Sequence, residues 1–453
     1  MRARSASALA LVLLLTGCAG GRLNNGLFQA DVAGGRYEAA YRQLESAKKD
    51  DVSVLLDRGL VLQALGRYEE SNAAFEQAER LIDDLYTRSL SKEALSLLTN
   101  DLAVDYRATG YEHAYIAYYR AWNYLQLGRE SDVLVEARVI NERLDFRSAS
   151  CPDKDGSCGH DVFLRYFSGL LFEWGGEPND AYVAYRQADL ARGTLSEAYG
   201  APPPPDLGER LTRLALRLGF AEEARRYAAS YGIDADALPR TPVSSVVVLL
   251  ENGMIARREG TSLTIPIFKG ETEKIRRDRD RWSRTLSERA HASHSAQSFE
   301  YLLHVAMPTL EERPPLGAQA IFELGGRELS TQIAAPLSAM AAAAFEDAMG
   351  GILLRAVTRA LVKYLASEAA EDKSEAAGIL VNLLGAATES ADTRSWRSLP
   401  HEIQVASAQV EPGSYRGRLT VRAPDGRILA EQAFPDIRVP DGGVALVRFR
   451  SGL

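Results

Sequence analysis

The chain has 453 residues, which is enough for two or three domains. It carries 53 Lys and Arg against 61 Asp and Glu, a formal net charge of −8 at pH 7. Because nucleic acid and anionic lipid both select a basic surface, this balance argues against nonspecific binding to either of them. We therefore expect no nucleic-acid partner.

The first residues are typical of an export signal. Arg2 and Arg4 form a short basic start, and the apolar run that follows is too short to span a bilayer. This run ends in the sequence LTGC at residues 15–18, which resembles the lipobox of bacterial lipoproteins. The resemblance implies that residues 1–17 are removed and that the thiol of Cys18 carries lipid. An ordinary secretory signal with an incidental cysteine is the alternative.

The same resemblance implies a location. Lipid on Cys18 would hold the protein on a membrane, at roughly 0.8 kcal/mol for each buried methylene. Ala19, rather than Asp, follows the cysteine, and in bacterial lipoproteins this implies sorting to the outer membrane. We therefore expect a lipid-anchored protein of the outer membrane whose body faces the periplasm.

Two further cysteines lie close together in the sequence CPDKDGSC. An export signal implies an oxidising compartment, so Cys151 and Cys158 are predicted to form a local disulfide. The alternative is a calcium loop, because acidic residues and a serine follow the spacing of an EF-hand ligand set. Against it, Cys158 replaces the glycine of that loop and Leu164 replaces its last glutamate. The candidate calcium ligands are Asp153, Asp155, Ser157 and Asp161.

Residues 18–238 show a helical repeat. Five segments place a glycine at a predicted helix–helix turn, with small and large apolar residues at fixed offsets around it. The pattern resembles the tetratricopeptide repeat, in which small residues let two antiparallel helices approach closely. Stacked helix pairs of this kind build an extended concave surface that binds partners. The turn glycines are Gly35, Gly66, Gly128, Gly176 and Gly219.

One helix of the array, within residues 111–124, is unusually aromatic. At helical spacing, Tyr115, Tyr119 and Trp122 share one face of it. Packing in the core of the array is one interpretation of this face. The other is a groove that recognises a peptide or a glycan by aromatic stacking, which makes these three residues candidate partner-binding residues.

The chain changes character after residue 238. Residues 239–391 combine short strands with long helices, and they include a predicted hairpin with its turn at Gly325-Gly326. An apolar run at about residues 336–366 predicts a long core helix with a solvated basic stripe on one side. The alternative is that this stripe contacts an anionic partner. The residues of the stripe are Arg355, Arg359 and Lys363.

The tail, residues 392–453, alternates as four short strands separated by tight turns. This pattern predicts a small antiparallel sheet, or one layer of a sandwich. The predicted fold class is therefore α+β, with an all-α repeat array followed by a mixed α/β region that ends in this sheet.

The stretch DTRSWRSLP, residues 392–400, lies between a predicted helix and the tail strands. Pro400 prevents helix beyond the residue before it. Trp396 is predicted to lock the preceding helix onto the sheet, while Arg394 and Arg397 bond the carbonyl end of that helix. A ligand or partner site is the other interpretation, so these two arginines and the tryptophan are also candidate partner-binding residues.

The sequence contains no recognisable catalytic motif. It has no H-E-x-x-H zinc motif, no G-x-S-x-G elbow, no P-loop and no G-x-G-x-x-G. His291 and His294 are three residues apart and could share a metal, but two surface histidines are the simpler interpretation. We therefore predict a protein that is not an enzyme and that holds no cofactor and no metal.

The order of these features resembles a family of bacterial outer-membrane lipoproteins with tetratricopeptide-like repeats and a C-terminal ADTRSWxxLP-type segment, here residues 391–400. The stretches LLENGMIARREGTSLTIPIF and FEDAMGGILLRAVTRALVKY belong to the same resemblance. It implies placement in the cell envelope, with envelope assembly or peptidoglycan synthesis as the setting, and no known catalytic residues. We expect a lipid-anchored periplasmic scaffold or adaptor that binds protein partners through the repeat surface. A glycan- or peptide-binding envelope module is the alternative.

Overall fold

The computed structural model describes residues 23–48, 51–87, 106, 108–150, 161–268, 299–317, 319–371 and 390–452. Several sequence predictions lie outside these residues. They are the signal peptide with its lipidated Cys18, the disulfide between Cys151 and Cys158, and the histidine pair His291 and His294.

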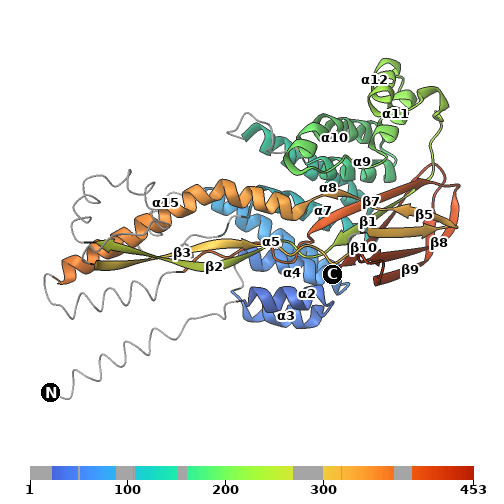
Figure 1. Cartoon of the computed structure of the whole chain (residues 1–453). Coiled ribbons are helices and arrows are strands. Elements are labelled where there is room, and N and C mark those ends of the chain that lie inside the picture. The colour runs from blue at the N-terminus through green and yellow to red at the C-terminus, as the bar shows by residue number, and fades with distance from the viewer. Residues whose placement is uncertain are drawn as a thin grey trace.

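Five antiparallel helix pairs form an array along one side of the molecule (Figure 1). Within each pair the helices contact one another, and successive pairs contact through α3 with α4, α5 with α7, α8 with α9, and α10 with α11. The array is therefore continuous from its first pair to its last. The pairs are α2 (Asn25–Ala33) with α3 (Tyr37–Ser46), α4 (Val52–Ala64) with α5 (Tyr68–Thr87), α7 (Gly110–Leu127) with α8 (Glu130–Ser150), α9 (Val162–Trp174) with α10 (Pro178–Tyr199), and α11 (Leu207–Arg217) with α12 (Ala221–Tyr231).

The glycines have the roles that the repeat pattern predicts. All five turn glycines have a positive φ between 66° and 87°, a conformation that other residues rarely adopt. Inside the pairs, a Cβ on Gly59 would lie 2.5 Å from the ring of Phe75, and one on Gly169 would lie 2.4 Å from the ring of Tyr185. Only glycine allows these helices to pack so closely. The tetratricopeptide-like arrangement of the array is confirmed.

Two four-stranded sheets pack face to face beside the array. The first sheet has the order β10-β1-β7-β6, and the second has the order β5-β4-β8-β9. Beyond the array a single turn of 3-10 helix, η2 (Ala235–Ala237), precedes the first strand. The strands are β1 (Ser245–Asn252), β4 (Gln319–Leu324), β5 (Arg327–Ser330), β6 (Gln332–Ala335), β7 (Glu402–Gln409), β8 (Gly413–Arg422), β9 (Ile428–Val439) and β10 (Val444–Ser451).

The first sheet is the middle layer of three. Val247 and Leu249 on one face of β1 belong to the core that the sheet shares with the helices. Val246 and Val248 on its other face belong to the core between the two sheets. Because β1 is apolar on both faces, it requires covering on both sides. The helical array supplies one cover and the second sheet supplies the other.

The tail strands do not form a sheet of their own, so that part of the fold prediction is wrong. β7 pairs antiparallel to β1, β10 pairs parallel to β1, and β8 pairs with β4. Both sheets therefore combine strands from before and after residue 391, and the two kinds alternate in the first sheet. The sandwich is present, but the tail contributes strands to both of its layers. The hairpin with its turn at Gly325-Gly326 is confirmed as β4 and β5.

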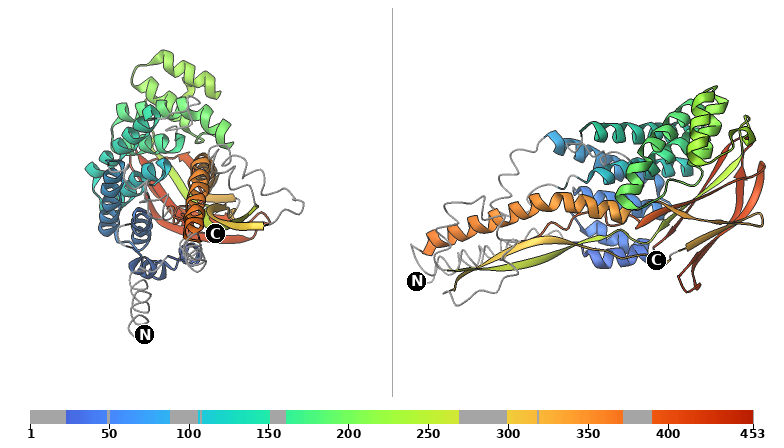
Figure 2. Two further views of the ribbon diagram at one scale, coloured as in Figure 1. Left: turned by 90° about the vertical axis from the view of Figure 1, so that its left-hand side faces the viewer. Right: turned by 45° about the horizontal axis from the view of Figure 1, so that its top comes forward.

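A long arm extends away from the array and the sandwich (Figures 1 and 2). It consists of the two-stranded ribbon of β2 (Arg257–Phe268) and β3 (Phe299–Glu311), with α15 (Leu337–Glu371) lying along β3. Within the part of the chain that the structure describes, α15 is the one helix long and apolar enough to cross a membrane, over Leu337–Ala360.

The prediction of a core helix with a solvated basic stripe needs correction. Only 22% of the apolar segment of α15 is buried, because the narrow ribbon covers one side of the helix. Arg359, placed in the solvated stripe, is fully buried beside Ala356, Val357 and Ala360. Arg359 therefore lies on the packed side of the helix.

Candidate partner-binding groove and the joint beside it

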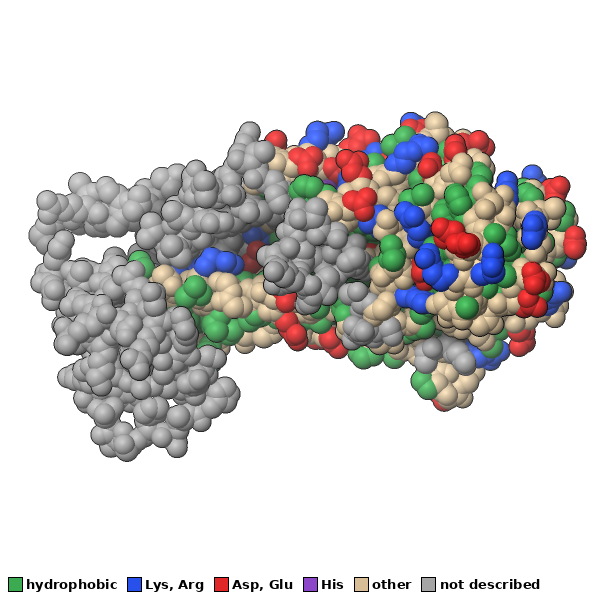
Figure 3. Space-filling model, turned by 90° about the horizontal axis from the view of Figure 1, so that it is seen from above, with side chains coloured by type: hydrophobic (Ala, Val, Ile, Leu, Met, Phe, Trp, Pro, Cys, Tyr) green, Lys and Arg blue, Asp and Glu red, His purple; other side chains and the backbone are tan. Residues whose placement is uncertain are grey.

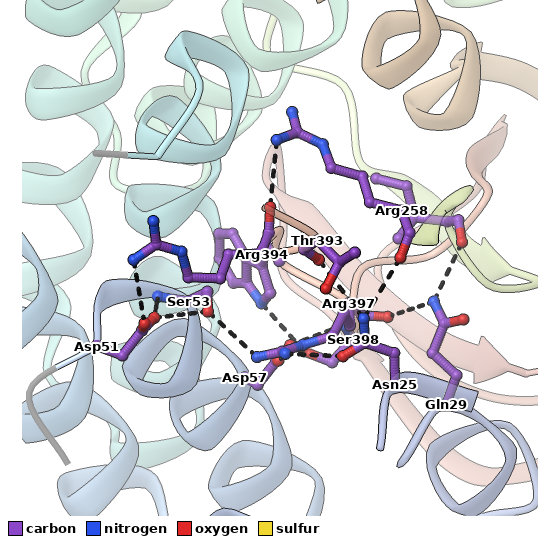
Figure 4. A network of polar contacts seen from close by, with 12 residues as sticks. Asn25, Gln29, Asp51, Ser53, Asp57, Arg258, Thr393, Arg394, Arg397 and Ser398 are labelled. Atoms are coloured by element: carbon purple, nitrogen blue, oxygen red, sulfur yellow. Dashed lines mark hydrogen bonds and ion pairs between the residues drawn. The ribbon is translucent and has the colours of Figure 1, made fainter. Parts of the chain in front are cut away.

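The stretch DTRSWRSLP joins the sheets to the first helices of the array (Figure 4). Trp396 is fully buried, and its ring lies 5.7 Å from that of Phe75 and 5.4 Å from that of Tyr119. Its backbone N–H donates a hydrogen bond of 2.7 Å to Oε1 of Glu112 at the start of α7. The other oxygen of Glu112 accepts from the backbone N–H of Thr109, which precedes that helix. One carboxylate thus caps α7 and holds the tryptophan.

A buried ion pair lies next to the tryptophan. The guanidinium of Arg397 donates to Oδ2 of Asp57 on α4 at 2.7 Å. The backbone N–H and the hydroxyl of Ser398 both donate to Oδ1 of the same carboxylate, each at 2.8 Å. Burial raises the pKa of Asp57, although Arg397 and Ser398 act in the opposite direction. Because each charge is fully desolvated, removing one partner leaves the other without compensation.

The second arginine of the stretch is held in a similar way. Arg394 donates to both oxygens of Asp392, at 2.8 and 2.9 Å, and lies 3.6 Å from Asp51 at the start of α4. From α2, the amide of Gln29 donates to the backbone carbonyls of Arg397 and Ile255. The stretch therefore joins the sheets to the array, and its arginines bond acidic residues that include Asp51 and Asp57 of the array. The preceding helix, which was predicted to be the partner of this stretch, lies outside the described residues.

The aromatic face of α7 is internal. Tyr115 and Tyr119 are fully buried, and the exposed fraction of Trp122 is 3%. Core packing therefore accounts for the two tyrosines, and neither is accessible to a partner. The same holds for Trp396, which is buried in the joint. Trp122 differs, because it also lines a cavity.

Arg394 and Arg397 line a polar cavity of about 670 Å³ beside the joint. Its acidic members include Asp51 and Glu259, and Arg257 is ion-paired to Glu259 at 2.5 Å. Four cations line the cavity against two anions, but Asp392 and Asp57, which pair with Arg394 and Arg397, offset the difference. It offers no field of one sign to a charged ligand.

A larger groove, of about 990 Å³, lies between the array and the sheets. Side chains of α4, α7 and α9 form one wall, and strands β9 and β10 form the other. Polar, apolar and aromatic side chains line the helical wall, while β10 contributes both apolar side chains and arginines. Residues that represent the two walls are Gln63, Ala64, Gln126, Trp174, Leu446 and Arg448.

Two arginines of β10 share one buried carboxylate beside the groove. Arg448 donates to both oxygens of Glu251 on β1, at 2.7 and 3.0 Å, and to the amide of Gln63 at 2.6 Å. Arg450 donates to the same carboxylate at 3.3 Å. Burial alone would lower the pKa of Arg448, but Glu251 and Tyr118 outweigh it and raise this pKa above its ordinary value. Two positive charges against one negative charge leave a positive surplus at the groove.

Sequence reasoning missed this cluster. The signal was present, because Arg448 and Arg450 are two residues apart on a predicted strand and therefore share one face. On a strand that is otherwise apolar, such a pair indicates a buried acidic partner. The identity of that partner was not readable, since Glu251 lies almost 200 residues earlier in the chain.

The surface charge outside the groove is mixed. Seen from above, acidic and basic side chains are interspersed over the body of the molecule (Figure 3). This face therefore offers a partner no large field of one sign. The groove differs from it in combining a small positive surplus with aromatic walls.

The helix pairs place the first half of the chain in the class of tetratricopeptide-like helical repeats. No protein-family model matches the chain, and no curated protein matches it in sequence. Among solved structures, it is similar to MamA residues 41-end from Desulfovibrio magneticus RS-1, at 16% identity over 48% of this chain and 94% of that one, with a TM-score of 0.28. A putative kinesin light chain from Podosopora anserina, with TPR-like repeats, is 12% identical over 46% of this chain and 91% of that one, also with a TM-score of 0.28. At these TM-scores the likeness carries no conclusion about function.

Proposed function

We propose that this protein is a lipid-anchored scaffold of the bacterial cell envelope that binds a protein partner in the groove between the array and β10. The observation that carries the proposal is the groove itself, which has about 990 Å³ of space between two walls from opposite ends of the chain. Helical-repeat arrays commonly use their extended concave surfaces for binding. The lipobox supports the anchor, and the family resemblance supports envelope assembly or peptidoglycan synthesis as the setting.

The joint explains how the groove keeps its shape. Trp396 and the pair of Arg397 with Asp57 attach the sheets to α4, α5 and α7, beside the helical wall. Arg448 bridges the two walls directly, because it bonds Gln63 on α4. A binding site whose walls are already fixed loses less conformational entropy when a partner binds. The groove is therefore preorganised.

Photo-crosslinking in living cells tests the binding site. A photoreactive residue replaces Gln126, which is exposed at the groove, and in a control it replaces Leu190 of α10, which is 69% exposed. We expect one reproducible protein adduct from position 126 and none of that mass from position 190. The same adduct from both positions, or none from either, would contradict the groove.

Fractionation tests the anchor. Cys18→Ser, made with an ordinary cleavable secretory signal in place of residues 1–17, removes the thiol that would carry lipid, and we expect this variant to move from the membrane fraction to the soluble fraction. The substitution leaves the groove unchanged, so crosslinking of the purified variant from position 126 provides a matched control. A Cys18→Ser protein that stays in the membrane fraction would contradict the anchor.

The aromatic lining favours a second candidate function. Trp122 and Trp174 line the groove together with Tyr37 and Tyr68, and aromatic faces also bind sugars and peptides by stacking. In this alternative the protein is a glycan- or peptide-binding envelope module. Retention of the purified protein on isolated peptidoglycan sacculi, reduced by Trp174→Ala, would support it. Absence of retention would favour the protein partner.

A further inference from the structure

Strand β10 is an edge strand that lies open to the groove. It is the first strand in the sheet order β10-β1-β7-β6, so β1 is its neighbour on one side only. Among the described residues, no strand pairs with its other side. The groove lies along that strand, since it is lined by Val444, Leu446 and Arg450.

The hydrogen bonds at both ends of β10 show which backbone groups are free. The carbonyls of Gly443 and Ser451 accept from the N–H groups of Ser245 and Gly253, at 3.0 and 2.8 Å. In a strand, the N–H and C=O of one residue point the same way and alternate from residue to residue. The odd-numbered residues of β10 therefore point their backbone groups toward β1. The outward backbone groups belong to Val444, Leu446, Arg448 and Arg450.

The other three edge strands of the two sheets are protected, and β10 is not. β5 and β6 have four residues each, and β6 carries an irregularity in its pairing with β7. β9 contains Pro435, and its register with β8 shifts close to that proline. Short length, bulges and proline are the usual means of blocking an edge. β10 has eight residues, no proline and a continuous register with β1.

The charges at this edge indicate what would bind there. Arg448 and Arg450 share the single carboxylate of Glu251, which leaves a positive surplus at the groove. This surplus occurs in a chain whose formal net charge is −8. The facing helical wall presents Trp122 and Trp174, which suit apolar side chains. A carboxylate on the bound segment would complement the charge, and its apolar side chains would face the array.

We propose that the free edge of β10 accepts an extended peptide segment of the partner as an additional strand, and that this segment carries a carboxylate which lies near Arg448 and Arg450. The inference rests on the proposed function, because it specifies how the partner binds in the same groove. Backbone hydrogen bonds would supply affinity, and the side chains that alternate toward the array would supply specificity.

Peptide display tests this mode of binding. The probe is a library of random peptides of eight residues, the length of β10, selected on the full-length protein in detergent. We expect the enriched peptides to alternate apolar residues with other residues and to contain Asp or Glu. Replacing that acid by its amide in a selected peptide should weaken binding several-fold. Enrichment of peptides with helical periodicity, or no effect of the amide, would overturn the proposal.

A pair of variants isolates the backbone of the edge. Leu446→Pro removes an outward N–H without touching the ladder with β1, while Leu446→Ala removes the same side chain and keeps that N–H. We expect Leu446→Pro to weaken peptide binding about tenfold or more, which corresponds to 1.4 kcal/mol, and Leu446→Ala to weaken it clearly less. Equal effects of the two substitutions would overturn strand addition.

Hydrogen exchange provides a measurement that needs no variant. If Leu446→Pro fails to fold, the wild-type protein is compared with and without a selected peptide. Amide exchange in residues 444–451 should slow in the complex, because the free edge becomes hydrogen-bonded. Unchanged exchange there, with peptide bound, would overturn the proposal.

The remaining outcomes separate this inference from the proposed function. A crosslink from position 126 that persists in Leu446→Pro would mean that a partner binds the groove without adding a strand, so the proposed function would stand and this inference would fail. Loss of the crosslink in Leu446→Pro but not in Leu446→Ala would support both. A dimer in solution that is lost in Leu446→Pro would assign the edge to a second copy of this chain and would overturn the peptide segment.

Discussion

Replacing Trp396 by alanine should cost a large part of the stability of the protein. The side chain is fully buried and packs against Phe75 and Tyr119, which belong to two different helices of the array. A buried tryptophan covers about 150–250 Å², and at about 25 cal/mol for each Å² this amounts to roughly 4–6 kcal/mol. Measured losses for Trp→Ala in protein cores are about 3–5 kcal/mol, and we expect the same range here.

Urea unfolding followed by far-ultraviolet circular dichroism measures this loss. Trp174→Ala is the matched control, because Trp174 is only half-buried on the groove wall. We expect that control to lose less than about half as much free energy of unfolding, since less apolar area leaves water there. Equal losses for the two variants, or a loss below about 1 kcal/mol for Trp396→Ala, would refute the view that the tryptophan joins the array to the sheets.

Two further predictions concern buried charges. Arg397→Met should reduce the free energy of unfolding by about 3–5 kcal/mol, because it leaves Asp57 buried without its partner. Asp57→Asn in the same chain should restore part of this loss. A double-mutant cycle measured by urea unfolding checks both effects. Burial raises the pKa of Glu136 to about 7 despite the nearby Arg120, which lies 3.0 Å away. Folding therefore favours the protonated form of Glu136. The contribution of this group to the free energy of unfolding is complete below about pH 4.5. It is lost as the pH rises through about 7, by up to about 3 kcal/mol. Urea unfolding at pH 5 and pH 8 should show a smaller pH dependence for Glu136→Gln, and an unchanged dependence would contradict this assignment.

The repeat array could be predicted because its signals are local. Gly66 forms the turn after α4, and Gly59 within α4 allows α5 to pack closely against it. Both glycines therefore act on a helix that follows directly in the chain. Each helix pair can therefore be recognised from its own segment. The hairpin at Gly325-Gly326 was predictable for the same reason, since its turn residues stand between the two strands that they join.

The sheets and the groove could not be predicted because their signals are distant in the chain. Alternation identifies β10 as a strand, but it does not show that the strand pairs parallel to β1, almost 200 residues earlier. From the sequence, Arg397 was predicted to bond a helix end and Arg359 was predicted to lie in solvent, since a charged residue is usually exposed. Burial of these residues depends on contacts across the fold, such as that of Arg397 with Asp57.

The central claim is that a protein partner occupies the groove between the array and β10. The most direct test is the dissociation constant of the partner identified by crosslinking, measured with wild type and with Ala64→Trp, which places a bulky ring in the groove from the end of α4. Leu190→Trp, on the exposed surface of α10, is the control. We predict at least about tenfold weaker binding for Ala64→Trp alone, a difference of about 1.4 kcal/mol. Equal affinity for all three proteins would contradict the account.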